Sequence, residues 1–346
     1  MACRPHVLRC AALAVLLLCM GNVSAAQPAI NPYPNTEGLG VDFDKSEDWY
    51  RHCMRVQRLA PPRAAGKPNK LRCDATSLYY LKHDQSATSA AEWDQVRTCA
   101  ETSGNDAVLM MLYANGYGVA RDADRAIVHA CRLDAAKAEM EARVDHLAAG
   151  AAANHPFDLC DHITSGRMGG VCAAIGEERD DRVRAARLDR FAAALAPQAR
   201  QPFARLRKAA DAFAQKSADE VDMSGTGAAG FMFRHTGRRD EEFMEVVLKA
   251  ASGRLPRAGA AQLAELERQL DGHYRRLLGA APGKDKHPDR LPQSTVARED
   301  VRGTGRAWLA YRDAWEAFAA VARLPTDVTS IKAMLARQRI AQLKRL

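Results

Sequence analysis

Residues 105–131 read NDAVLMMLYANGYGVARDADRAIVHAC, and they carry the clearest structural pattern in the chain. Its apolar residues recur at three- and four-residue spacing, which is typical of a helix that packs one face against a core. Gly116 stands where a helix would end in a left-handed residue, and Gly118 follows in a tight turn. Asp122 or Asp124 can begin a second helix. The stretch therefore predicts two packed helices joined by a short turn.

The rest of the chain carries the same helical pattern. Alanine is abundant, runs of β-branched residues are missing, and Trp308, Tyr311 and Trp315 share one helix face. We expect an all-α fold in which a helical hairpin repeat region precedes an antiparallel helical bundle. The expected helices run from near Ser46 and over 73–82, 90–102, 105–115, 121–148, 176–195, 198–220, 227–252, 258–279, 293–323 and 327–344. The glycine-containing stretch from Cys160 to Cys172 is expected to turn, and residues 280–292 to form a linker.

The first 25 residues have the features of a secretory signal peptide. Arg4 and Arg9 precede the apolar run 11–20, and cleavage is expected after the small residue Ala25, or one position later at Ala26. Lipidation at Cys19 is an alternative. Residues 26–45 then predict a flexible leader. No later segment is apolar enough to span a bilayer, so we expect a periplasmic or secreted protein without a transmembrane segment.

Six cysteines follow the signal peptide, and an even number in an oxidising compartment favours disulfides. These are Cys53, Cys73, Cys99, Cys131, Cys160 and Cys172. The simplest pairing joins neighbours, as 53–73, 99–131 and 160–172, although six cysteines allow 15 connectivities. A metal site at Cys160, His162 and Cys172 is an alternative without a paired C-x-x-C motif to support it.

The charge of the chain bears on the kind of partner. Removing residues 1–25 takes away two arginines and lowers the formal net charge from +8 to +6. Residues 301–346 hold nine Lys and Arg against three Asp and Glu. An exported destination argues against nucleic acid as the partner. The basic C-terminal region is either a solvated helix face or a surface for an acidic partner or an anionic lipid surface.

Residues 105–131 resemble a Sel-one-like repeat, a relative of the tetratricopeptide repeats. The pattern LY..G.GV..D...A is carried by Leu112, Tyr113, Gly116, Gly118, Val119, Asp122 and Ala126. The resemblance implies stacked helical hairpins over residues 46–150, with a concave protein-binding surface. A single hairpin packed inside a larger helical body is the alternative.

The C-terminal region, residues 256–346, resembles the lysozyme inhibitor LprI N-terminal-like domain family of exported helical proteins. The family pattern LN..Y…W..YRD…R…L is matched by Leu270, Asp271, Tyr274, Trp308, Tyr311, Arg312, Asp313, Arg337, Arg339 and Leu343. Trp315 and Glu316 stand where the family carries a cysteine, so its disulfide is absent.

The family resemblance implies an inhibitor of a lysozyme or another cell-wall hydrolase. Trp308, Tyr311 and Arg312 are expected either in the core or in contact with a partner. Arg312, and Arg337 or Arg339, are expected to pair with Asp313, Glu316 or a helix C-terminus. Lysozymes are commonly basic, and like charges would slow association with this basic region.

No motif of a metalloprotease, P-loop protein, serine hydrolase or zinc site occurs, so we expect no enzyme activity, cofactor or metal. Four weaker features allow a functional interpretation, but a structural role is favoured for each. They are the loop 224–227 as a phosphate loop, Asp219, Glu220 and Asp222 as a cation site, His129, His146, His155 and His162 as metal ligands, and Glu241, Glu242 and Glu245 as catalytic acids.

These observations predict an exported envelope protein that binds another protein. The partner would be a lysozyme or a secreted effector. A periplasmic immunity protein and an assembly scaffold are alternatives, and a hydrolase is the less supported one. Residues 151–255 are set apart as a helical middle region between the two resemblances.

Overall fold

A computed structural model describes residues 32–60, 73–150, 155–279 and 287–346. Within these ranges the protein is helical and has no β-strand, so the prediction of an all-α fold is confirmed. None of the described helices is long and apolar enough to cross a bilayer. The signal peptide and both cleavage positions lie outside the described residues.

The chain forms twelve described α-helices and two short 3-10 helices. The α-helices are α1 (Asp48–Val56), α2 (Ala75–His83), α3 (Ala90–Ser103), α4 (Asp106–Asn115), α5 (Ala123–Ala130), α6 (Lys137–Ala148), α7 (Gly166–Ala194), α8 (Pro197–Ser217), α9 (Ala228–Ala251), α10 (Ala260–Gly279), α11 (Arg298–Ala322) and α12 (Val328–Leu343). The 3-10 helices are η1 (Gln57–Leu59) and η2 (Ala218–Glu220).

The predicted hairpin at 105–131 is present as α4 and α5. Gly116 ends α4 in the left-handed conformation with φ +73°, and Gly118 has φ +69°. A Cβ atom at Gly118 would lie 2.5 Å from the Cβ of Trp93, so only glycine fits this contact. The Asp122 carboxylate accepts a hydrogen bond from the Arg125 amide at 2.9 Å and begins α5.

The expected single helix over 121–148 is divided into α5 and α6, which are separated by residues 131–136. Part of the segment expected to be a flexible leader contacts the chain at this interruption. The Asn35 amide donates to the Cys131 carbonyl at 2.7 Å, and the Lys137 amide donates to the Leu39 carbonyl at 3.1 Å. Leu39 is buried in the core. Residues 33–39 therefore pack against the segment between α5 and α6, whereas residues 40–42, 44 and 45 are exposed. Residues 26–31 of the expected leader lie outside the described ranges.

A second difference concerns the stretch from Cys160 to Cys172. The turn ends at Ser165, whose hydroxyl caps α7 by accepting from the Met168 amide at 3.2 Å. Gly169 and Gly170 lie inside the helix instead of in a turn, because α9 crosses α7 here. A Cβ on Gly170 would lie 3.0 Å from the Cβ of Ala229. Gly170 thus permits a close helix crossing, whereas a Cβ on Gly169 would meet no atom within 4 Å.

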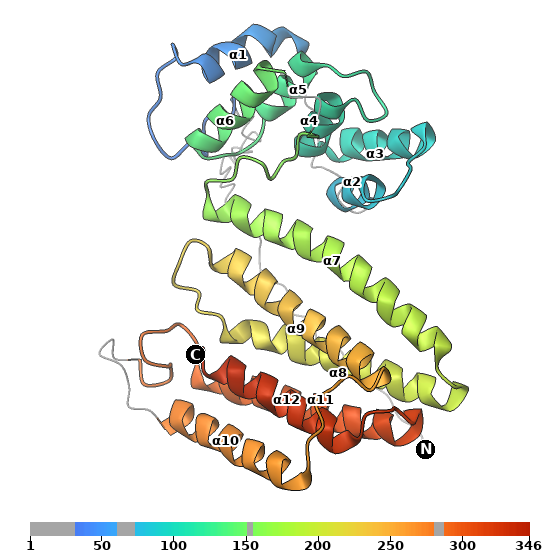
Figure 1. Ribbon diagram of the computed structural model, residues 1–346. Helices are drawn as coiled ribbons and strands as arrows, with labels where there is room; N and C mark the ends of the chain where they lie inside the picture. Colours follow the sequence, from blue (N-terminus) through green and yellow to red (C-terminus); the bar gives the residue numbers. More distant parts are fainter. Residues whose placement is uncertain (1–31, 61–72, 151–154, 280–286) are drawn as a thin grey trace, which may run out of the picture.

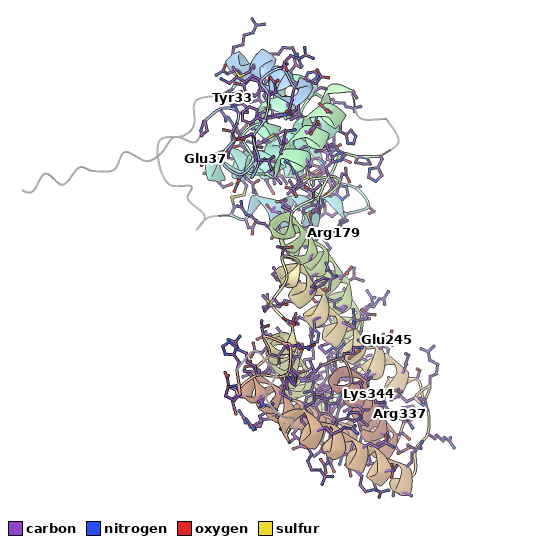
Figure 2. All side chains as sticks on the ribbon, turned by 90° about the vertical axis from the view of Figure 1, so that its left-hand side faces the viewer. Tyr33, Glu37, Arg179, Glu245, Arg337 and Lys344 are labelled. Carbon is purple, nitrogen blue, oxygen red and sulfur yellow. A yellow bond between two sulfur atoms is a disulfide. The ribbon has the colours of Figure 1, made fainter. Side chains whose placement is uncertain are left out.

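Two hydrophobic cores organise the molecule. The first runs from Leu39 to Ile175 and fills the space among α1 to α6. The second runs from Leu188 to Leu343 and fills the space among α8 to α12. Figure 1 shows α7 lying between these groups, with α9 beside it, and Figure 2 shows the narrow region that they form. Residues 151–255 therefore contribute side chains to both cores.

Candidate binding cleft

Three disulfides hold the N-terminal part, and two of them differ from the neighbour pairing. Cys53 is bonded to Cys131 and Cys73 to Cys99, so the expected pairs 53–73 and 99–131 are wrong. The reason is that α1 packs on α5, while Cys73, just before α2, lies close to α3, on which α2 packs. The third expected pair, Cys160–Cys172, is confirmed. Three disulfides fit an extracellular or periplasmic location.

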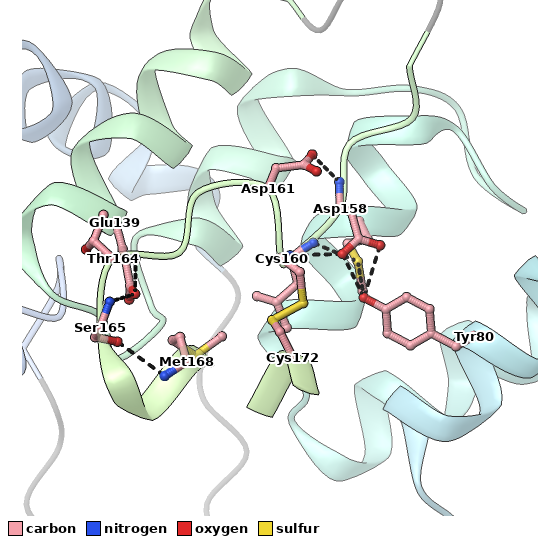
Figure 3. The surroundings of a disulfide bond; sticks show 11 residues. Tyr80, Glu139, Asp158, Cys160, Asp161, Thr164, Ser165, Met168 and Cys172 are labelled. Carbon is pink, nitrogen blue, oxygen red and sulfur yellow. Dashed lines mark hydrogen bonds between the residues drawn. A yellow bond between two sulfur atoms is a disulfide. The ribbon is translucent and has the colours of Figure 1, made fainter. Parts of the chain in front are cut away.

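The Cys160–Cys172 disulfide attaches the start of α7 to the N-terminal core. Figure 3 shows it beside Tyr80, whose hydroxyl donates to Asp158 at 2.9 Å. The Cys160 amide also donates to Asp158 at 2.9 Å. Both sulfurs are used in the bond, and the His162 ring instead lies 2.7 Å from the His146 ring, nitrogen to nitrogen. The alternative metal site is therefore not formed.

The W..YRD residues of the family pattern lie mainly in the second core. Trp308 is 2% exposed and Tyr311 is 4% exposed. The Tyr311 ring stacks on Phe213 with centroids 5.6 Å apart. Arg312 lies over the Trp308 ring at 5.5 Å and pairs with Asp313 at 3.2 Å, as expected. This motif therefore builds the bundle and offers little surface to a partner.

Arg339 forms the central buried ion pair of the bundle. Its guanidinium donates to both Glu220 carboxylate oxygens, at 2.7 and 2.5 Å, and its Nε donates to the Tyr274 hydroxyl at 2.8 Å. The expected pairing of this arginine with Asp313 or Glu316 is wrong, because Arg339 points into the core. Arg337, the other candidate, is half-buried on the same helix. Arg339 thereby joins α12 to η2 and α10.

The acidic trio considered as a cation site is not brought together. Glu220 is used by Arg339, and Asp219 forms an ion pair with Lys216. Asp222 accepts hydrogen bonds from the Ser224 amide at 2.9 Å and the Thr295 hydroxyl at 3.0 Å. The Asp222 contacts hold the loop 221–227, which precedes α9, against Thr295. Of the four candidate histidines, His146 lies against His162, whereas His129 is bonded to Asp106 at 2.7 Å, so the four do not share one site.

A cleft opens between η2, the first turns of α9 and the end of α12. Its volume is about 250 Å³. We call it the arginine cleft, because four arginines line it together with polar and apolar side chains. The lining residues are Glu220, Val221, Phe231, Arg234, His235, Arg238, Arg239, Gln342, Arg345 and Leu346. The buried Arg339–Glu220 pair fixes one wall of this cleft.

The arginine cleft is cationic, and carboxylates neutralise only part of the positive charge of its arginines. Arg239 is 4% exposed, and its Nη2 donates to Glu242 at 3.0 Å. Its Nε and Nη1 have no hydrogen-bond partner among the described residues, and neither has His235 Nε2. Burial and the nearby arginines lower the pKa of His235 to about 4, so this ring is neutral at pH 7. The positive charge of the cleft therefore comes from its arginines.

The sequence contains a signal for this cleft that the motif analysis missed. Residues 233–239 read FRHTGRR, and they place Arg234 and Arg238 four residues apart on one helix face. Arg345 joins them from more than 100 positions away, and no local pattern indicates that contact. A basic helix face was expected only near the C-terminus.

A second cluster of charge lies where α7 crosses α9. Glu177, Asp181 and Asp240 come close enough together to share one cation. Arg184 already forms ion pairs with Glu177 and Asp181. A Cβ at Gly237 would collide with the Glu177 carboxylate. The cluster is therefore a structural contact between α7 and α9, and the Arg184 guanidinium supplies its positive charge.

Asp240 makes this crossing sensitive to pH. Burial, and secondarily the Asp181 carboxylate, raises the pKa of Asp240 from 3.8 to about 7, while Arg184 opposes the shift. Between these values the unfolded chain ionises Asp240 and the folded protein keeps it protonated. Ionisation then favours unfolding, so this group makes stability fall as pH rises from about 4 toward about 7.

We expect Asp240→Asn to remove this dependence. At about pH 8 the variant should be more stable than the wild type by on the order of 1 kcal/mol, and at about pH 4 equally stable. Urea unfolding at several pH values measures the difference. Asp180→Asn, at an exposed position of α7, is the matched control: it retains Asp240, and its stability should fall with pH as that of the wild type does. Equal stability of wild type and Asp240→Asn at pH 8 would contradict the assignment.

Comparisons with known proteins found no counterpart. No protein-family model matches the chain. No curated protein and no solved structure matches it either.

Proposed function

We propose that this protein is an exported, non-enzymatic binding protein that captures a protein partner in the cell envelope. The single observation that carries the proposal is the arginine cleft, in which Arg234, Arg238 and Arg345 surround a recess above the buried Arg239. The second core, which packs α8 to α12 together, supports a rigid platform for such a cleft. The resemblance to the LprI-like family agrees with a role in binding.

The chemistry of the cleft favours an acidic partner. Opposite charge accelerates association, whereas like charge weakens it. A typical basic lysozyme would therefore be a poor ligand for this cleft, and inhibition of a lysozyme would need another surface. The burial of Trp308 and Tyr311 argues against the family motif as that surface. An acidic hydrolase or an acidic secreted effector fits better, and the second would make the protein an immunity protein.

A hydrolase is the less supported alternative. Glu242 accepts from Arg239 at 3.0 Å and from Gln342 at 3.1 Å, and the Arg184 guanidinium lies 3.9 Å from Glu241. Glu245 pairs with Lys249 at 2.6 Å. Each of these carboxylates thus lies beside a basic or amide side chain, and this supports structural roles for them.

Affinity capture tests the proposal. Processed protein purified from the periplasm serves as bait, and captured proteins are identified, purified and titrated against it by calorimetry. We expect at least one acidic envelope or effector protein to bind the wild type directly. Capture of no protein, together with full activity of several muramidases in the presence of the bait, would contradict the proposed function.

A further inference from the structure

The arrangement of charge at the arginine cleft indicates what kind of group it binds. Arg234 and Arg238 lie one helical turn apart on α9, and Arg345 follows the end of α12. All three are exposed at the rim, while Arg239 lies buried beneath them. Arginine presents a planar fork of donors that matches a carboxylate or phosphate in two-point contact. The rim is therefore suited to an oxyanion.

The carboxylates already near the cleft do not neutralise this rim. Glu220 accepts hydrogen bonds from Arg339, and Glu242 accepts them from Arg239 and Gln342. Among the described residues no ion pair engages the three rim arginines, and Arg234 instead lies over the Phe231 ring at 5.1 Å. A negative group from outside the chain would thus complete the charge balance.

The cleft also has an apolar side. Phe231 is 55% exposed at its mouth, and Val221 and Leu346 contribute to its lining. A volume of about 250 Å³ is somewhat smaller than a typical drug-sized pocket of roughly 300–1,000 Å³ and admits one or two side chains. The ligand that matches both sides carries an acidic group next to an apolar one.

We propose that the arginine cleft binds an acidic segment of the partner protein, in which a glutamate or aspartate side chain meets the rim arginines and a neighbouring apolar side chain packs on Phe231. This rests on the proposed function and names the chemistry of its partner. A phosphate-bearing membrane surface fits less well. The cations converge on a recess, whereas a bilayer surface is contacted best by cations spread over an open face.

Fluorescence anisotropy with a labelled hexapeptide that alternates glutamate and leucine tests this inference. The full processed protein is titrated against this peptide and against a peptide in which glutamine replaces each glutamate. We expect saturable binding of the acidic peptide only, and at least about tenfold weaker binding by Arg234→Ala/Arg238→Ala, which is about 1.4 kcal/mol. Phe231→Ala should weaken binding by a smaller factor.

Controls separate the cleft from general charge and from folding. Arg187→Ala/Arg190→Ala removes the same charge from exposed positions of α7 and should bind like the wild type. Thermal unfolding should be unchanged in both double variants, because exposed substitutions alter stability by about 0.5 kcal/mol or less.

Three results would overturn the inference. These are equal affinity for the two peptides, unchanged affinity in the cleft variant, and stronger cleft-dependent binding of inorganic phosphate or phosphatidylglycerol vesicles than of the acidic peptide. In each case an envelope partner could still be captured by the wild type, so failure here is distinguishable from failure of the proposed function. A captured partner that binds Arg234→Ala/Arg238→Ala as tightly as the wild type would also overturn it.

Discussion

Replacing Cys53 and Cys131 together with alanine is expected to lower the free energy of unfolding of the N-terminal core by about 4.5 kcal/mol. The bond joins residues 78 positions apart, and it restricts the unfolded chain more than a short cross-link does. Both cysteines are fully buried in the first core, so the alanine variant also loses the packing of two buried sulfur atoms. Guanidinium unfolding followed by near-UV circular dichroism measures the loss.

The matched control is Cys160→Ala/Cys172→Ala. That bond spans 12 positions, and the same relation gives a loss of about 3 kcal/mol. The order of the two variants matters more than either value, because the strain of a native bond adds to or subtracts from the entropy. An equal or smaller loss on removal of Cys53–Cys131 would contradict this account. Peptide mapping should independently find Cys53 linked to Cys131 and not to Cys73.

The two wrong disulfide pairs show what a local pattern can and cannot predict. The turn at Gly116 and Gly118 and the cap at Asp122 depend on neighbouring residues, and they were predicted correctly. The contact of Cys53 with Cys131 depends on how α1 packs against α5 after the chain has formed three intervening helices. Sequence distance favours short links, but packing places these two sulfurs together.

The same reasoning applies to residues 32–45. Their content of proline, asparagine and glycine predicted a flexible leader, because few of these residues can build a core. In the structure Asn35 satisfies a carbonyl left without a partner where α5 ends, and Leu39 fills a gap beside α6. An extended segment can thus be held by backbone groups of helix ends, and composition alone does not reveal this.

The candidate site was the least predictable part. The family pattern drew attention to Trp308 and Tyr311, which the structure places in the core. The arginine cleft combines one helix face near residue 235 with the end of the chain, and η2 forms its third wall. Glu220 was considered with its neighbours as an exposed cation ligand. Its pairing with Arg339, 119 positions later on α12, depends on the packing of the bundle and has no local sequence signal.

Glu220→Ala is expected to destabilise the bundle by about 3–5 kcal/mol. The side chains of Arg339 and Glu220 are 0% and 1% exposed, so removing the carboxylate leaves a guanidinium buried without its counterion. The Tyr274 hydroxyl and Gln342 would still accept hydrogen bonds from Arg339, but neither carries a negative charge. Urea unfolding measures the loss, followed by tryptophan fluorescence in a background with Trp49 and Trp93 replaced by phenylalanine, so that Trp308 and Trp315 of the bundle give the signal.

The double variant Glu220→Leu/Arg339→Met separates the cost of a broken pair from the contribution of an intact one. Apolar replacement of a buried pair often leaves stability nearly unchanged, since the desolvation cost of both charges disappears with their attraction. We therefore expect the double variant to recover most of the stability lost in Glu220→Ala. A small loss in Glu220→Ala would contradict the pair as the tie between η2 and α12. Equal losses in both variants would contradict the uncompensated charge of Arg339 as the cause of the loss in Glu220→Ala.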